Sequence, residues 1–131
     1  MRIALAAVAM LLAQQLTTWD GVFTAEQAGR GEKVYAERCA RCHGDGLQGV
    51  ESAPALTGTT FYATWEGETL DALFERMRSS MPADAPGSLS RAQNADILAH
   101  MLKTGGYPAG QTALDPQAGA LTRIKVLMYR P

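Results

Sequence analysis

Apolar residues recur every three or four positions in three stretches of the chain, at residues 24–39, 69–78 and 90–103. This spacing places them on one face of a helix, so we expect an amphipathic helix in each stretch. Thr24 and Ser90 stand at the start of the first and third stretches, and each has a glutamine three residues later. That arrangement predicts a capping box at the start of both helices.

Gly31 lies on the apolar face of the first predicted helix. Glycine in a helix interior costs about 1 kcal/mol relative to alanine, so its position predicts a close crossing with another helix. Gly29 is expected to be a tolerated surface glycine.

The C-terminal residues follow a different pattern, because Ile124, Val126 and Met128 fall on alternate positions. Alternation predicts a short strand or an extended arm laid on the surface. Stretches rich in glycine and proline separate the predicted helices and indicate loops. We therefore expect an all-α protein with about three main helices, long loops and a short extended C-terminal arm.

The chain starts with a basic residue, Arg2, and an apolar run that extends to residue 12. This run of about ten residues is too short for a membrane-spanning helix, which needs ~20, and predicts a secretory signal peptide at residues 1–13. We place the cleavage after Ala13; an uncleaved apolar anchor or a misassigned start is the alternative. Export would bring the chain to the bacterial periplasm, with no stable membrane insertion after cleavage.

We divide the remaining chain into a lead-in at residues 14–23, one domain at residues 24–110 and an extension at residues 111–131 packed on that domain. The total of 131 residues suits one domain with a leader. The formal net charge is −1, so the composition does not indicate nucleic-acid binding or a basic tract that would bind a membrane.

The candidate chemistry lies at the end of the first predicted helix, in the sequence Cys39-Ala40-Arg41-Cys42-His43. On a helical turn, the first, fourth and fifth residues of this sequence share one face. The pattern C-x-x-C-H is the attachment signature of a c-type haem. Two thiols can add to the two vinyl groups of one porphyrin while the imidazole reaches the iron. The haem would complete the core of a small chain, so we expect the chain without haem to fold poorly.

Zinc sites and thioredoxin-like redox motifs also contain C-x-x-C pairs. A zinc site needs two more ligands, and the chain has one other histidine, His100, and no other cysteine. A thioredoxin-like motif needs a βαβ setting, which the pattern does not predict. We interpret His100 as a partly buried packing residue, with iron ligation as the alternative.

Met81 is the candidate for the sixth iron ligand. It follows the second predicted helix and precedes Pro82, which stiffens the backbone beside it. In a loop, its thioether can be aimed at the iron. Met77 and Met101 are rivals, but each lies on an apolar helix face, where core packing explains it. The absence of any methionine ligand is a further alternative.

Three residues between the motif and the second helix are candidates for contact with the haem. A histidine ligand needs an acceptor for its second ring nitrogen, and the carbonyl of Pro54 is the candidate; an ordinary turn proline is the alternative. Leu56 is expected to pack on the haem face. Trp65 is expected to cover the haem edge and to offer its indole N–H to a propionate, or else to join Phe61 and Tyr62 in the core.

Residues 24–107 resemble the class I cytochrome c family. The specific marks are the Cys39/Cys42/His43 motif and the Met81-Pro82 pair, and the supporting marks are Gly31, Tyr35, Pro54, Leu56 and the last helix. The resemblance implies the cytochrome c fold, wrapped around one covalently attached haem c that is bound through Cys39 and Cys42 and ligated by His43 and Met81. In the family, an aromatic of the last helix packs against the first helix, at a position that His100 occupies here.

The resemblance implies a monohaem electron carrier and not an enzyme. It would move single electrons between periplasmic redox proteins, from a dehydrogenase donor to a terminal oxidase or another cytochrome. Residues 65–110 look like small periplasmic cytochromes that accept electrons from dehydrogenases, including quinoprotein alcohol dehydrogenases. We expect a monomer that docks weakly and transiently. The alternatives are a fixed electron-transfer subunit of a dehydrogenase complex, with the chain from Tyr107 onward as an interaction arm, and a haem peroxidase or gas sensor with an open sixth site.

Four arginines lie near the candidate iron ligands, and they are Arg38, Arg41, Arg76 and Arg78. They are expected to form a basic rim that steers acidic partners, or else to be solvated helix faces.

Overall fold

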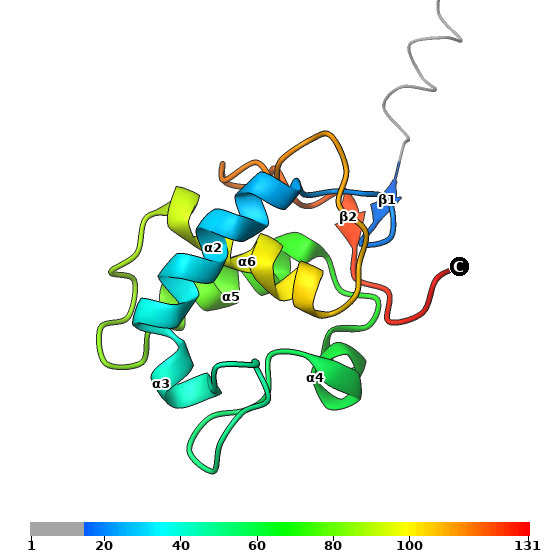
Figure 1. The fold of residues 1–131 in the computed structure, drawn as a ribbon. Helices are drawn as coiled ribbons and strands as arrows, with labels where there is room; N and C mark the ends of the chain where they lie inside the picture. The colour runs from blue at the N-terminus through cyan, green and yellow to red at the C-terminus, as the bar shows by residue number, and fades with distance from the viewer. Residues whose placement is uncertain (1–14) are drawn as a thin grey trace, which may run out of the picture.

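The three predicted helices are present in the computed structural model, which describes residues 15–131 (Figure 1). In chain order the elements are β1 (Leu16–Thr17), α2 (Ala25–Arg38), α3 (Ala40–His43), α4 (Gly58–Trp65), α5 (Leu70–Ser80), α6 (Arg91–Thr104) and β2 (Ile124–Lys125). The helical class is therefore as predicted. The predicted signal peptide at residues 1–13 lies outside the described residues. Within residues 15–131, no helix has the length and apolar character needed to cross a membrane.

Helices α2 and α6 cross closely at the centre of the fold, with Gly31 at the contact (Figure 1). A Cβ atom added to Gly31 would lie 1.8 Å from the carbonyl oxygen of Asp96. Next to this contact, the rings of Tyr35 and His100 pack with their centroids 5.3 Å apart, and Arg30 forms an ion pair with Asp96 at 3.2 Å. The close crossing predicted from Gly31 is confirmed. The imidazole of His100 takes the place of the aromatic ring expected on the last helix.

Replacing Gly31 by alanine is expected to lower the free energy of unfolding by about 2 kcal/mol, because the clashing atoms are backbone and the helices would have to separate. Gly29→Ala is the matched control in the same helix, since a Cβ there meets no atom within 4 Å. It is expected to gain up to about 1 kcal/mol from helix propensity. Urea unfolding of both variants measures the difference. Equal stabilities would contradict a close crossing at Gly31.

The two predicted capping boxes differ in outcome. At Ser90 the box is complete, because the Ser90 hydroxyl accepts from the backbone of Gln93 and the Gln93 side chain accepts from the backbone of Ser90. At Thr24 only the hydroxyl contact forms. The side-chain amide of Gln27 instead exchanges two hydrogen bonds, of 3.0 and 2.8 Å, with the backbone of Leu114. The prediction of a full box at Thr24 is wrong because this amide satisfies a buried backbone group of the C-terminal segment.

The C-terminal segment is part of the core and not an arm on the surface. β2 pairs in parallel with β1, and the backbone N–H of Val126 donates to the carbonyl of Glu68 on the other side, at 2.9 Å. Val126 is fully buried, and Leu114, Leu121 and Ile124 are buried with it. The extended chain predicted from the alternation is present, but both neighbours of β2 come from distant parts of the sequence. Figure 1 shows this strand pair at the opposite end of the molecule from α3.

Candidate haem-binding site

The C-x-x-C-H turn forms where α2 ends and α3 begins. Cys39 caps both helices, and its carbonyl accepts hydrogen bonds from the backbone N–H groups of Cys42 (3.2 Å) and His43 (2.9 Å). Both thiols are free; Cys39 is half-buried and Cys42 is exposed. Burial raises the pKa of the Cys39 thiol to about 11, so this thiol is protonated at neutral pH. Three side chains with the chemistry of haem attachment and iron ligation thus lie on one helical turn.

His43 is buried, and its ring is held by the loop that follows the turn. Its Nδ1 atom lies 2.8 Å from the carbonyl oxygen of Pro54, the acceptor that the sequence pointed to. A carbonyl oxygen only accepts, so Nδ1 carries the proton of the neutral ring and Nε2 carries the free lone pair. The remaining nitrogen, Nε2, is therefore the one available to a metal.

The loop from Gly44 to Leu56 is held by hydrogen bonds within its own backbone, and these bring Pro54 back to His43. The backbone N–H of Gly49 donates to the carbonyl of His43 at 2.7 Å, and that of Leu56 donates to Leu47 at 2.9 Å. Gly49 has a φ of +79°, and a Cβ there would lie 2.6 Å from the backbone nitrogen of Ala55. Glycine is therefore required at this turn of the loop.

The three candidate methionines lie in different environments. Met101 is buried in the core on α6, and Met77 is half-buried against the core on α5. Met81 directly follows α5, its backbone N–H donates to the carbonyl of Met77 at 3.0 Å, and the residue is 37 % exposed. Among residues 15–131, the only other large apolar side chains that are exposed are Val50 and Tyr129. Core packing therefore explains Met77 and Met101, but it does not explain Met81.

The aromatic patch that the sequence predicted is divided between two environments. Phe61 and Tyr62 are buried, and the Tyr62 hydroxyl donates to the carbonyl of Met101 at 3.2 Å. These two residues are core. Trp65 is half-buried, as is Leu56, and both pack against the core with part of their surface exposed.

The donor set fits a covalently attached haem. It comprises two free thiols, an imidazole with an available Nε2, a loop thioether and half-buried apolar side chains. Vinyl addition needs the thiols, the iron takes imidazole and thioether, and the porphyrin face needs apolar contact. Among the described residues, no group of three or more His, Cys, Asp and Glu side chains is arranged to hold a metal ion. The zinc alternative therefore has no ligand set in this part of the chain.

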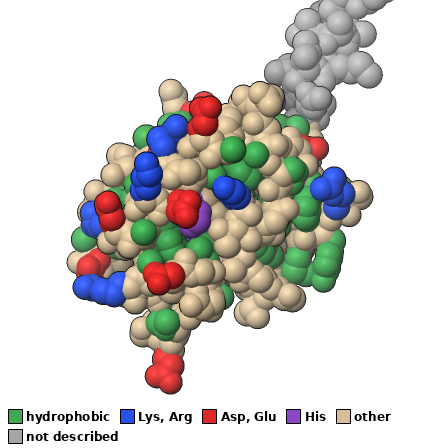
Figure 2. All heavy atoms as spheres, in the orientation of Figure 1, with side chains coloured by type: hydrophobic (Ala, Val, Ile, Leu, Met, Phe, Trp, Pro, Cys, Tyr) green, Lys and Arg blue, Asp and Glu red, His purple; other side chains and the backbone are tan. Residues whose placement is uncertain are grey.

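Two of the four arginines near the candidate iron ligands are paired with acidic side chains. Arg41 pairs with Asp84 at 3.6 Å, and Arg78 pairs with Glu75 at 2.8 Å. The hydrogen bonds of Arg78 and then Arg91 lower the pKa of Glu75, so this carboxylate stays charged beside them. Arg38 donates to the hydroxyl of Ser88. Arg41 and Arg78 thus have an acidic side chain beside them, which reduces the net positive charge of the rim, and Figure 2 shows Lys and Arg side chains lying among Asp and Glu side chains on the face drawn.

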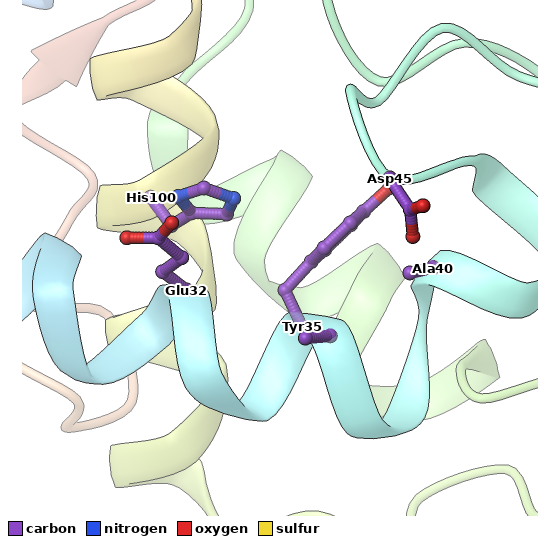
Figure 3. Close-up of a pocket in the computed structure, with 6 residues that line it drawn as sticks. Glu32, Tyr35, Ala40, Asp45 and His100 are labelled. Atoms are coloured by element: carbon purple, nitrogen blue, oxygen red, sulfur yellow. The ribbon is translucent and has the colours of Figure 1, made fainter.

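A small pocket of about 220 Å³ lies beside the helix crossing (Figure 3). Its lining comprises Glu32, Tyr35, Ala36, Ala40, Asp45 and His100. His100 is half-buried here, and burial lowers the pKa of its imidazole, which favours the neutral ring. The interpretation of His100 as a packing residue is confirmed by its contact with Tyr35.

One contact at this pocket was not predicted from the sequence. The hydroxyl of Tyr35 donates to the carbonyl oxygen of Gly44 at 2.6 Å. The sequence marks Tyr35 as one of the supporting features of the cytochrome c resemblance, which does not predict a hydrogen bond to the loop. Its distance of nine residues from Gly44 gives no signal of a hydrogen bond, because the chain between them turns from α2 into α3.

The fold and this turn define a class I c-type cytochrome. The family model described as "Cytochrome C oxidase, cbb3-type, subunit III" matches residues 26–101, and the chain belongs to that family. Membership implies a covalently bound haem c. The match begins in α2 and ends in α6, so the strand pair and the C-terminal segment lie outside it.

Two proteins illustrate the relationship. The chain is 33 % identical over 78 residues to the thiosulfate dehydrogenase of Stutzerimonas stutzeri (strain A1501). The aligned region covers 55 % of this chain and 25 % of that protein. The chain thus spans a quarter of the length of this relative. The crystal structure of the sulfane dehydrogenase SoxCD from Paracoccus pantotrophus superposes with a TM-score of 0.48 at 23 % identity, over 67 % of this chain and 52 % of that one.

Proposed function

We propose that the chain carries single electrons, with one haem c attached through Cys39 and Cys42 and the iron held between His43 and Met81. In this proposal residues 24–110 form the haem-binding domain, and residues 111–131 are an extension whose buried apolar side chains complete its core. The observation that supports this best is the hydrogen bond from His43 Nδ1 to the Pro54 carbonyl, 2.8 Å long. It selects the tautomer whose Nε2 binds iron and makes that nitrogen more basic.

Met81 is the second iron ligand in this proposal. A bound haem c would provide a one-electron iron couple. An iron held by both His43 and Met81 would have no free position for oxygen or peroxide, and the thioether would favour the reduced iron. Leu56 would pack against the haem, and Trp65 would shield it and could offer its indole N–H as a hydrogen-bond donor. Electrons therefore enter and leave by outer-sphere transfer.

The partners in this proposal are redox proteins of the periplasm, to which the predicted leader exports the chain. A dehydrogenase is the donor, and an oxidase or another cytochrome is the acceptor. The similarity to part of a thiosulfate dehydrogenase supports a partner of the dehydrogenase class. Docking is transient and of small area, and the carrier is a monomer.

Absorption spectra of the exported holoprotein, ferric and ferrous, with and without carbon monoxide, test the proposal. We expect a c-type spectrum with the charge-transfer band of methionine-bound ferric iron and no response to carbon monoxide. Ready binding of carbon monoxide by the ferrous protein would overturn the carrier and favour a haem peroxidase or gas sensor.

A fixed electron-transfer subunit of a dehydrogenase complex is the second candidate. The similarity to the thiosulfate dehydrogenase favours this candidate, because the matched region makes up only a quarter of that longer protein. The chain from Tyr107 onward is not available as a free arm, because Leu114, Leu121 and Val126 are buried in the core. A permanent partner would therefore need another surface. Gentle extraction and size-exclusion chromatography distinguish the two candidates: a monomer supports the carrier, and copurification with a dehydrogenase supports the subunit.

A further inference from the structure

Tyr35 connects the helix crossing to the loop that follows the C-x-x-C-H turn. Its side chain is 2 % exposed, and its hydroxyl donates to the carbonyl oxygen of Gly44, the residue directly after His43. We propose that Tyr35 is a positioning residue, which holds the backbone beside His43 so that the imidazole keeps its orientation toward the iron. This role requires that His43 is the proposed iron ligand.

Tyr35 is held in place by the packing of the two long helices. Its ring packs against His100 of α6, and α2 lies against α6 at Gly31. Figure 3 shows Tyr35 and His100 on these two helices, with Tyr35 extending toward the loop that carries Asp45. Burial raises the pKa of the Tyr35 hydroxyl to about 12, so this group remains a donor at physiological pH. The crossing of α2 and α6 thus fixes the position from which the Tyr35 hydroxyl donates to Gly44.

The bond to Gly44 reaches the imidazole through the backbone of the loop. The carbonyl of Gly44 also accepts from Leu47 at 3.2 Å, and the carbonyl of His43 accepts from Gly49 at 2.7 Å. The same loop carries Pro54, whose carbonyl lies 2.8 Å from His43 Nδ1. Because the Tyr35 bond fixes the start of the loop, its loss would loosen the acceptor that orients the ring.

A weaker hydrogen bond from His43 Nδ1–H to the Pro54 carbonyl is expected to change the properties of His43 as an iron ligand. A histidine whose Nδ1–H is held by a carbonyl is a more basic iron ligand, and this favours the oxidised iron. We therefore expect Tyr35→Phe, which keeps the ring but removes the hydroxyl, to raise the midpoint potential. The exchange of the His43 Nδ1 proton with solvent, followed by NMR of the holoprotein, is expected to become about fivefold to tenfold faster, which is the effect of one lost hydrogen bond.

Tyr107→Phe is the matched control. Tyr107 is also buried, and its hydroxyl donates to a backbone carbonyl, that of Leu127, at 2.8 Å. The control loses a similar hydrogen bond outside the loop that follows His43. It is expected to lose stability but to keep the midpoint potential and the Nδ1 exchange rate of the wild type.

Measurements on the wild-type holoprotein distinguish a failure of His43 as the iron ligand from a failure of Tyr35 as its positioning residue. If its NMR spectrum lacks the shifted ring protons of an iron-bound histidine, the assignment of His43 fails, and the role of Tyr35 fails with it. If the histidine is bound but Tyr35→Phe changes the potential and the exchange rate no more than Tyr107→Phe does, Tyr35 is only a packing residue. A change confined to Tyr35→Phe supports the positioning role.

Discussion

Replacing Met81 by alanine is expected to leave the haem attached but to open the sixth coordination position of the iron. Alanine has no donor atom, so the ferric charge-transfer band should disappear and the ferrous protein should bind carbon monoxide stoichiometrically. The midpoint potential is expected to fall by on the order of 100 mV, within the ~0.8 V range over which axial ligands tune haem. Met81 is suited to this role because it lies in a loop and is 37 % exposed.

Met77→Ala is the matched control for this experiment, because Met77 lies one helical turn earlier and bonds to Met81 through the backbone. The side chain of Met77 is half-buried against the core, so its removal is expected to cost about 2 kcal/mol of stability. Its absorption spectrum and its indifference to carbon monoxide should match the wild type. An unchanged ferric spectrum in Met81→Ala, or loss of the charge-transfer band in Met77→Ala, would contradict the ligand assignment.

Replacing both Cys39 and Cys42 by alanine is expected to abolish covalent haem attachment. Each thiol forms one thioether bond, so haem stain on a denaturing gel should fall to background, while Cys42→Ala alone should retain haem through a single bond. Most of the helical circular dichroism should also be lost, because the half-buried Leu56 and Trp65 would lose the apolar partner proposed to cover them. A double variant with the unfolding transition of the wild type would contradict a structural role for the haem.

Local features were predictable from the sequence because they depend on neighbours along the chain. The spacing of Cys39, Cys42 and His43 places them on one turn in any helix, and the Ser90 capping box needs only Gln93, three residues later. Gly31 predicted the helix crossing because glycine destabilises a helix interior and is expected there where a larger side chain would not fit. In the structure, the Asp96 carbonyl leaves no room for a larger side chain.

Other features depend on residues that are far apart in the sequence, and these the pattern could not specify. The alternation of Ile124 and Val126 indicated an extended segment, but only the folded chain places it between β1 and the Glu68 backbone and so buries it. Likewise, Gln27 has the spacing of a capping residue. The approach of Leu114 from 87 residues away redirects its amide.

The haem motif, the order of the helices and the candidate ligands are local patterns, so the sequence alone was enough to predict them. How these residues are held depends on the folded chain. It brings the Pro54 carbonyl to His43 Nδ1, the Tyr35 hydroxyl to Gly44 and the C-terminal segment into the core. The physical reason is that a buried polar group takes whichever partner the fold brings within reach, and sequence separation does not restrict that choice.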